Sequence, residues 1–202
     1  VKYSLHRMED MRMTGKRHPY SSDFKIGLNK DLKIIAYEAT FYQNAGAAAD
    51  LSPAVMERTL FHCTNTYFIP NVKATAYSCR THLPPNTAFR GFGGPQGMFV
   101  IEAAIAKAAE HLKISATEIQ QKNLLKSGDE FPYGQLAESE ANECWNKAEA
   151  DFQISKMQQD VADFNTSNTL FKKGRNAYLF WNFVYQNFYE SGKIIGKCIY
   201  RW

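Results

Sequence analysis

Long apolar runs are absent from this 202-residue chain, and so is any segment that would carry it across a membrane. No stretch approaches the roughly 18–20 consecutive apolar residues of a membrane helix. Residues 1–7 contain neither a methionine nor the apolar core of a signal peptide. The sequence therefore predicts an internal piece of a longer chain, cytoplasmic in location and without a membrane partner.

Cysteine is scarce, and strong charge of one sign is missing. The four cysteines, Cys63, Cys79, Cys144 and Cys198, have no CxxC spacing and no histidines in metal-ligand order. We therefore expect reduced thiols and no zinc site. The formal net charge is only +4, and the last 28 residues hold four basic residues against one acidic residue. The rest of the chain is nearly neutral and offers no basic stripe for nucleic acid.

The chain has enough apolar residues for a core, with 45% hydrophobic and 22% charged residues. Strand-like segments come early and helix-like segments come late, which predicts an α+β fold. Asparagine, lysine and aspartate at positions 29–31 predict a hairpin turn between two strands. The expected strands cover residues 3–5, 24–28, 32–42 and 71–83, and the expected helices cover residues 95–112, 115–125 and 139–164, with a further helix from Ser52.

The helix that starts at Ser52 carries the first candidate functional residue. Ser52 is typical of an N-cap, and Pro53 is typical of the first helical position. Helical spacing puts one apolar face inward, so Arg58 points elsewhere. On this pattern alone, Arg58 is either a functional cation or a solvated residue of a surface helix. The inward face is expected to comprise Val55, Thr59, Leu60 and Cys63.

Residues 86–96 form a glycine-rich loop that leads into a helix. Three glycines in four positions allow the backbone to adopt positive φ and to approach a ligand closely. The exposed N–H groups of the following helix favour an anion, and Arg90 adds a bidentate anion clamp. Phe89 and Phe92 offer flat apolar faces. Such a loop suits a flat heteroaromatic substrate beside a phosphorylated or oxo-anionic cofactor, and the alternative is a structural turn with a core phenylalanine.

Together with this loop, several other segments resemble the xanthine dehydrogenase/aldehyde oxidase family, in its large molybdenum-binding (molybdopterin-binding) subunit. The resemblance runs in unbroken order over residues 1–174. It implies that the fold is an incomplete part of the molybdopterin-binding domain of a molybdenum hydroxylase. The segments that carry it are residues 6–11, 14–20, 24–27, 42–46, 56–62, 79–81, 86–96, 122–124 and 172–174.

The resemblance implies roles for five residues. Arg58 matches the arginine that positions a purine and stabilises negative charge developing on its ring, so it is the candidate catalytic and substrate-binding residue. Phe92 matches the phenylalanine that packs against the substrate, although it could also be a core residue. Phe89, Arg90 and Gly91 match the loop that lines the molybdenum cofactor. No residue of the chain is expected to ligate a metal directly.

Arg58 favours hypoxanthine and xanthine over aldehydes, since aldehyde oxidases of this family usually lack that arginine. The resemblance therefore implies a fragment of a xanthine dehydrogenase-like enzyme of purine catabolism. It implies molybdopterin in the intact protein, 2Fe-2S, FAD and NAD on other modules or subunits, an iron-sulfur/FAD subunit or domain as partner, and a homo-oligomer when complete. The family's general-base glutamate is missing, so the isolated chain is expected to be inactive. The alternatives are an aldehyde oxidase-like fragment and a truncated, non-catalytic binding or assembly paralogue.

Residues 175–202 differ in composition from the rest of the chain, because they hold nine of its aromatic residues. The spacing of these aromatic residues follows neither the period of 2 of a strand nor the period of 3.6 of a helix. They could form a C-terminal strand pair. Alternatively, they are a frame-shifted reading, because the codons of Trp181 and Asn182 read one base later encode a glycine. The shifted frame permits Met-Pro-Ile-Cys-Phe-Gly-Ile-Ser-Phe-Thr, which resembles the next strands of the family. We predict two regions, a domain fragment at 1–174 and an aberrant tail at 175–202.

Overall fold

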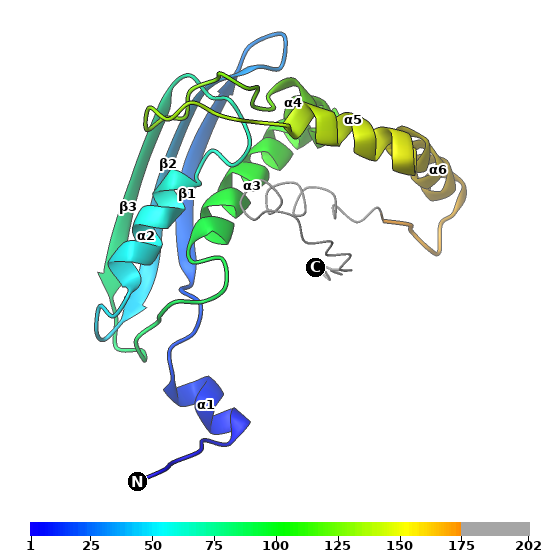
Figure 1. Ribbon diagram of the computed structural model, residues 1–202. Helices are drawn as coiled ribbons and strands as arrows, with labels where there is room; N and C mark the ends of the chain where they lie inside the picture. The colour runs from blue at the N-terminus through cyan, green and yellow to red at the C-terminus, as the bar shows by residue number, and fades with distance from the viewer. Residues whose placement is uncertain (175–202) are drawn as a thin grey trace. The chain divides into compact units, whose positions relative to one another are not determined.

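The computed structural model describes residues 1–174, and the predicted tail, residues 175–202, lies outside the described residues. The chain divides into two compact units (Figure 1). Among the described residues, the first unit comprises residues 1–123 and 130–135, and the second comprises residues 124–129 and 136–174. Each unit is described by itself.

The first unit combines a three-stranded sheet with helices, which confirms the predicted α+β class. The strand order is β1-β2-β3, with β1 antiparallel to β2 and β2 parallel to β3. The parallel pair needs a crossover, and α2 supplies it. The elements of this unit are α1 (Arg7–Met13), β1 (Tyr20–Leu28), β2 (Ile34–Gly46), α2 (Ser52–Phe61), β3 (Val72–Arg80), α3 (Gly94–Leu112) and α4 (Ala116–Lys122).

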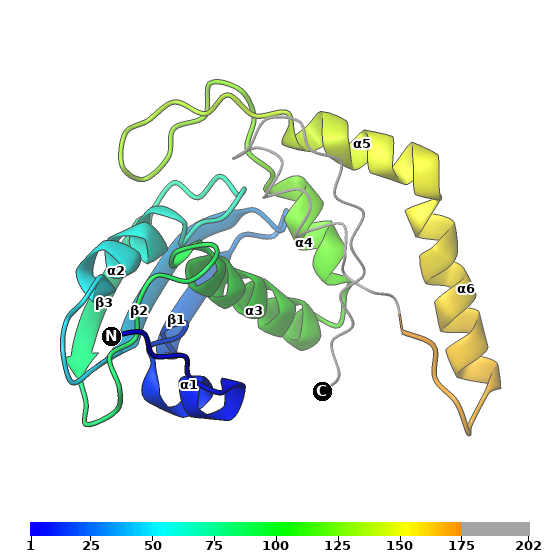
Figure 2. The ribbon, with the colours of Figure 1, turned by 60° about the horizontal axis from the view of Figure 1, so that its bottom comes forward.

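Alternation along the central strand β2 places the core on one face of the sheet. Tyr37, Ala39, Phe41 and Gln43 are all buried, whereas the residues between them are more exposed. Helix α2 packs on β3 and on α3, and α3 packs on β1, so the two helices cover this face (Figures 1 and 2). The core therefore lies between the sheet and α2 and α3.

The predicted hairpin turn at residues 29–31 is confirmed. The side-chain oxygen of Asn29 accepts hydrogen bonds from the backbone N–H groups of Asp31 and Lys33, each at 2.9 Å. An asparagine that bonds its own turn in this way is a common hairpin solution. Both flanking strands are longer than predicted, because β1 begins at Tyr20 and β2 continues to Gly46.

The predicted strand at residues 3–5 is wrong, because these residues have no regular secondary structure. The first element of the chain is the short helix α1. No residue of α1 is buried, so no apolar periodicity marks the helix in the sequence. Its first turn is closed by the backbone N–H of His6, which donates to Glu9 Oε2 at 3.0 Å. Capping, and not burial, defines this helix.

Helix α2 and the turn after it confirm most of the predicted inward face, because Val55, Thr59 and Cys63 are buried, whereas Leu60 is only half-buried. Its start differs from the prediction, because Ser52 is the first helical residue and Leu51 is the N-cap. The Ser52 hydroxyl is instead 2.8 Å from Nε2 of the buried His18. The serine is thus used for a long-range contact and not for capping.

The capping box predicted at Ser115 and Glu118 is confirmed at the start of α4. The helix ends at Lys122, earlier than the expected residue 125. The side chain of Asn123 explains this end, because its oxygen accepts from the N–H of Ile34 at 2.8 Å and its nitrogen donates to backbone carbonyls. A buried asparagine therefore ties the end of α4 to β2.

In the second unit, the single helix predicted at 139–164 is wrong. Two helices, α5 (Ala141–Phe152) and α6 (Ile154–Ser167), meet at Gln153, which has a φ of 48°. A left-handed residue cannot continue a right-handed helix.

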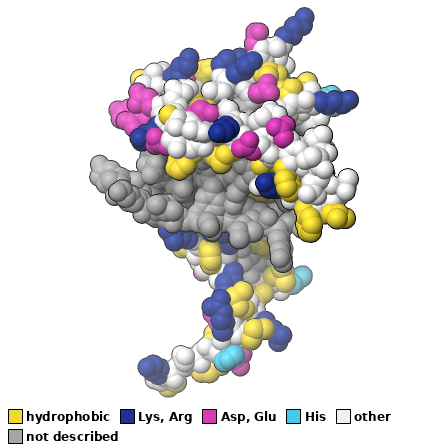
Figure 3. Space-filling model, turned by 90° about the vertical axis from the view of Figure 1, so that its right-hand side faces the viewer, with side chains coloured by type: hydrophobic (Ala, Val, Ile, Leu, Met, Phe, Trp, Pro, Cys, Tyr) yellow, Lys and Arg dark blue, Asp and Glu magenta, His cyan; other side chains and the backbone are white. Residues whose placement is uncertain are grey.

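No helix within residues 1–174 is both long and apolar enough to cross a membrane. Acidic and basic side chains are interspersed in the upper part of the surface shown in Figure 3.

Candidate functional site

The glycine-rich loop connects β3 to α3 and turns sharply just before the helix. Three consecutive residues have positive φ, namely Gly91 at 94°, Phe92 at 47° and Gly93 at 94°. Glycine adopts this conformation without cost, whereas a phenylalanine is strained there. The predicted positive-φ backbone is confirmed. The half-buried Phe92 adopts a left-handed conformation that is unfavourable for an aromatic residue, so the surrounding fold must hold it there.

The end of the loop packs directly against helix α2. A Cβ atom on Gly93 would lie 2.1 Å from the carbonyl oxygen of Val55, and one on Gly97 would lie 2.5 Å from that of Thr59. Only glycine permits these approaches. The hydroxyl of Thr59 also donates to the carbonyl oxygen of Gly93 at 3.0 Å. The fold thus places the loop on the helix that carries Arg58.

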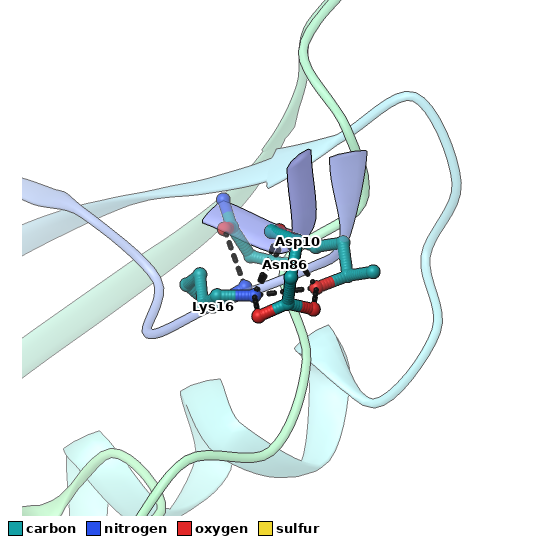
Figure 4. A network of polar contacts seen from close by, with 4 residues as sticks. Asp10, Lys16 and Asn86 are labelled. Carbon is teal, nitrogen blue, oxygen red and sulfur yellow. Dashed lines mark hydrogen bonds and ion pairs between the residues drawn. The ribbon is translucent and has the colours of Figure 1, made fainter. Parts of the chain in front are cut away.

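The beginning of the loop is anchored by the segment that precedes β1 (Figure 4). The backbone N–H of Lys16 donates to the side-chain oxygen of Asn86 at 3.4 Å, and the N–H of Thr87 donates to the carbonyl of Lys16 at 3.1 Å. The Lys16 ammonium forms an ion pair with Asp10 at 3.2 Å. Hydrogen bonds from Thr14 and then from Lys16 lower the pKa of Asp10.

Arg17 holds the middle of the loop. One guanidinium nitrogen donates to the carbonyl oxygen of Arg90 at 2.6 Å, and the guanidinium lies 4.6 Å from the centre of the Phe89 ring. This geometry combines a charge-assisted hydrogen bond with a cation–π contact. Arg17 was not assigned a role from the sequence, because it lies 73 positions from Arg90 and no local spacing links them.

The structure leaves Arg58 exposed on α2. Its charge nevertheless acts on a neighbour, because burial first and the Arg58 guanidinium second lower the pKa of His62 to about 4. The half-buried His62 ring is therefore neutral near pH 7. A neutral imidazole leaves Arg58 as the cation at this end of α2.

Phe89 and Arg90 are exposed and Gly91 is half-buried, so the candidate cofactor contacts form an accessible arc. The second terminal nitrogen of Arg17, the residue that contacts Phe89 and Arg90, is buried with no hydrogen-bond partner among residues 1–174. A buried guanidinium N–H without a partner is destabilising, and an acceptor atom on a bound ligand would relieve this cost. These features fit a flat, anionic cofactor such as molybdopterin. Within the described residues, no three His, Cys, Asp or Glu side chains gather as metal ligands.

Comparison with known proteins agrees with this geometry. Residues 1–124 match the family described as the molybdopterin cofactor-binding domain. Xanthine dehydrogenase/oxidase of Mus musculus is 41% identical over 175 residues, which is 86% of this chain and 13% of that protein. Nicotinate hydroxylase hnxS of Emericella nidulans is 37% identical over 182 residues, again 86% of this chain and 13% of that protein.

Solved structures show the same fold. The aldehyde oxidoreductase of Desulfovibrio gigas is 25% identical with a TM-score of 0.67, over 77% of this chain and 17% of that one. Quinoline 2-oxidoreductase of Pseudomonas putida 86 is 20% identical with a TM-score of 0.69, over 81% of this chain and 22% of that one, and it supports the fold alone. The chain spans about 13% of the length of the curated relatives it matches. It belongs to the molybdopterin cofactor-binding domain family, in the xanthine dehydrogenase/aldehyde oxidase group.

Proposed function

We propose that this chain is the substrate-pocket part of a xanthine dehydrogenase-like molybdenum hydroxylase that oxidises hypoxanthine or xanthine with oxygen derived from water. The observation that carries the proposal is the seating of the glycine-rich loop on α2, the helix of Arg58. The relatives named xanthine dehydrogenase, at up to 41% identity, support the purine substrate.

Each of the five residues has a physical task in this proposal. Arg58 orients the purine and stabilises the negative charge that develops on the ring during attack. Phe92 packs its ring against the substrate. The strained backbone at Phe92 holds this ring in place. The arc of Phe89, Arg90 and Gly91 borders the molybdopterin. When bound, the molybdenum cofactor supplies the two-electron oxidation of the purine carbon.

The remaining parts of the enzyme belong to other segments. We infer that a 2Fe-2S and FAD subunit or domain carries electrons onward to NAD, that the complete enzyme is a homo-oligomer, and that it works in the cytoplasm. The 202-residue chain alone lacks the family's general-base glutamate, so we expect it not to turn over xanthine. A molybdopterin-loaded chain that oxidised xanthine by itself would contradict this expectation.

Replacement of Arg58 tests the substrate. In the complete hydroxylase that carries this segment, we expect Arg58→Ala to reduce kcat/KM for xanthine by roughly 10²–10³-fold, because a lost charge-stabilising donor costs this much in other enzymes. Turnover of an aromatic aldehyde should change far less, because that reaction places no negative charge on a purine ring.

The matched control is Glu57→Ala, since Glu57 is the exposed neighbour on α2 and has no assigned role. Both substrates should be turned over normally by this variant. Equal losses for xanthine and aldehyde in Arg58→Ala would refute the purine assignment and favour an aldehyde oxidase-like enzyme.

A further inference from the structure

A line of hydrogen bonds crosses all three strands of the sheet, from the exposed Ser78 on β3 to a buried bond on the glycine-rich loop. The Ser78 hydroxyl on β3 donates to Gln43 Oε1 on β2 at 2.9 Å, and Gln43 Nε2 donates to the Tyr20 hydroxyl on β1 at 2.9 Å. Tyr20 Oη lies 2.9 Å from Thr59 Oγ1 on α2. Thr59 Oγ1 in turn contacts the carbonyl oxygen of Gly93 at 3.0 Å.

The direction of these hydrogen bonds follows from counting hydrogens. Thr59 has one hydroxyl hydrogen, and both of its other neighbours, the carbonyls of Gly93 and Val55, can only accept. Thr59 must therefore accept from Tyr20, and Tyr20 accepts from Gln43. The bonds from Ser78 to Thr59 therefore all run in one direction, an arrangement in which each bond polarises the next, and the single Thr59 hydrogen is shared between the carbonyl oxygens of Gly93 at 3.0 Å and Val55 at 3.1 Å. Burial also raises the pKa of Tyr20, so its hydroxyl remains a donor.

The end of this line joins the two predicted substrate contacts. Arg58 is the chain neighbour of Thr59, and Phe92 is the chain neighbour of Gly93, so a single hydrogen bond links the two pairs. Thr59 and Gln43 have no exposed surface, which shields this bond from competing water. The positive φ at Phe92 and Gly93 means that the loop needs such a restraint to keep its shape.

We propose that Thr59 and Tyr20 are positioning residues that fix Phe92 relative to Arg58. This inference rests on the proposed function for its effect on a purine, but its effect on the loop is independent of any substrate. Neither side chain is predicted to touch substrate or cofactor. Thr59 acts through the Gly93 carbonyl, and Tyr20 acts through the Thr59 hydroxyl.

The first experiment measures amide hydrogen exchange in the 202-residue chain. The N–H groups of Phe92, Gly94 and Gly97 bond to carbonyls within the loop and the first turn of α3, so they report on loop order. We expect Thr59→Val and Tyr20→Phe to speed their exchange by roughly fivefold to tenfold, the effect of losing one buried hydrogen bond. Thr59→Ser keeps the hydroxyl and should restore slow exchange.

The control is Tyr67→Phe, which removes another buried tyrosine hydroxyl, one that donates to Glu102 Oε1 at 2.7 Å and not toward the loop. This variant should lower overall stability without selective exchange at the loop. If Thr59→Val behaves like Tyr67→Phe, or if Thr59→Ser behaves like Thr59→Val, the positioning role is wrong.

The second experiment uses the complete hydroxylase with xanthine. We expect Thr59→Val to raise KM about tenfold with a smaller fall in kcat, because a displaced Phe92 weakens substrate binding, and Thr59→Ser should restore KM. The two hypotheses fail differently. If the unmodified enzyme does not oxidise purines but the exchange results hold, the proposed function is wrong and the loop restraint stands. If it oxidises xanthine and KM is the same in all variants, the function stands and the positioning role is overturned.

Discussion

Arg58 and His62 lie four residues apart at the end of α2, and their interaction offers a test of Arg58 that needs no enzyme activity. Burial is the larger cause of the low pKa of His62, about 4, and the Arg58 charge is the second. Because the native ring resists protonation, this group contributes stability that is complete above its ordinary value of 6.5 and is lost as the pH falls toward 4.

We expect Arg58→Gln to raise the pKa of His62 without restoring 6.5, because the burial remains. Proton NMR titration of the imidazole in the 202-residue chain measures this directly. The loss of unfolding free energy between pH 6.5 and pH 4 should also become shallower in the variant. Glu57→Gln serves as the control of opposite charge, and an unchanged His62 titration in Arg58→Gln would show that the guanidinium does not act there.

At the level of single residues, the sequence predicted burial and backbone conformation better than it predicted which distant residues contact one another. The spacing on α2 correctly placed Thr59 in the core, and the glycines of the loop correctly indicated positive φ. The contacts of Arg17 with Arg90 and of Thr59 with Gly93 span 73 and 34 positions. Contacts of such separation depend on how the elements pack, and no local period encodes them.

At the scale of elements, the junction between α2 and the loop depends on a glycine that meets two demands. Gly93 combines a φ of 94° with a Cβ position only 2.1 Å from the Val55 carbonyl oxygen. Gly128 has a similar φ of 91°, but a Cβ there would meet no atom within 4 Å. Substitution of Gly128 therefore tests backbone strain alone, whereas substitution of Gly93 tests backbone strain together with steric overlap.

We expect Gly128→Ala to cost about 1–2 kcal/mol, the price of a left-handed alanine. Gly93→Ala should cost clearly more, because the loop or α2 must also shift to relieve the overlap with Val55. Denaturant unfolding of both variants, followed by circular dichroism, compares these costs. Equal destabilisation would mean that the loop does not pack against α2 as described.

The element predictions failed where a helix had no apolar signal or carried a local break. Helix α1 buries none of its residues, and its methionines are exposed, so no inward face distinguished it from a loop. The boundary between α5 and α6 rests on one left-handed residue, Gln153, inside an otherwise continuous helical pattern. By contrast, the hairpin turn and the capping box of α4 were correctly predicted, since turn and capping chemistry is local.

At the scale of the whole molecule, the proposed function requires other segments to complete the site that the described part would border. The chain covers 13% of the length of the relatives it matches. Its sheet has two edge strands, β1 and β3, within the described residues. Edge strands with free backbone groups pair readily with further strands. Both facts support the proposal that the chain is a domain fragment and that hydroxylation would require further segments.

The sharpest test at this scale concerns the last 28 residues, which differ from the rest in aromatic content. We predict that the gene, read one base later after the codon of Gly174, encodes the string Met-Pro-Ile-Cys-Phe-Gly-Ile-Ser-Phe-Thr and continues into a glycine-rich molybdopterin segment with a glutamate base. The glycine is forced, because TGG for Trp181 followed by AA for Asn182 contains GGA. Sequencing of genomic DNA and of the transcript through this point decides the matter. If the shifted frame meets stop codons or encodes no such string, the tail is genuine, and the chain becomes a truncated relative whose binding role, and not its hydroxylation, requires explanation.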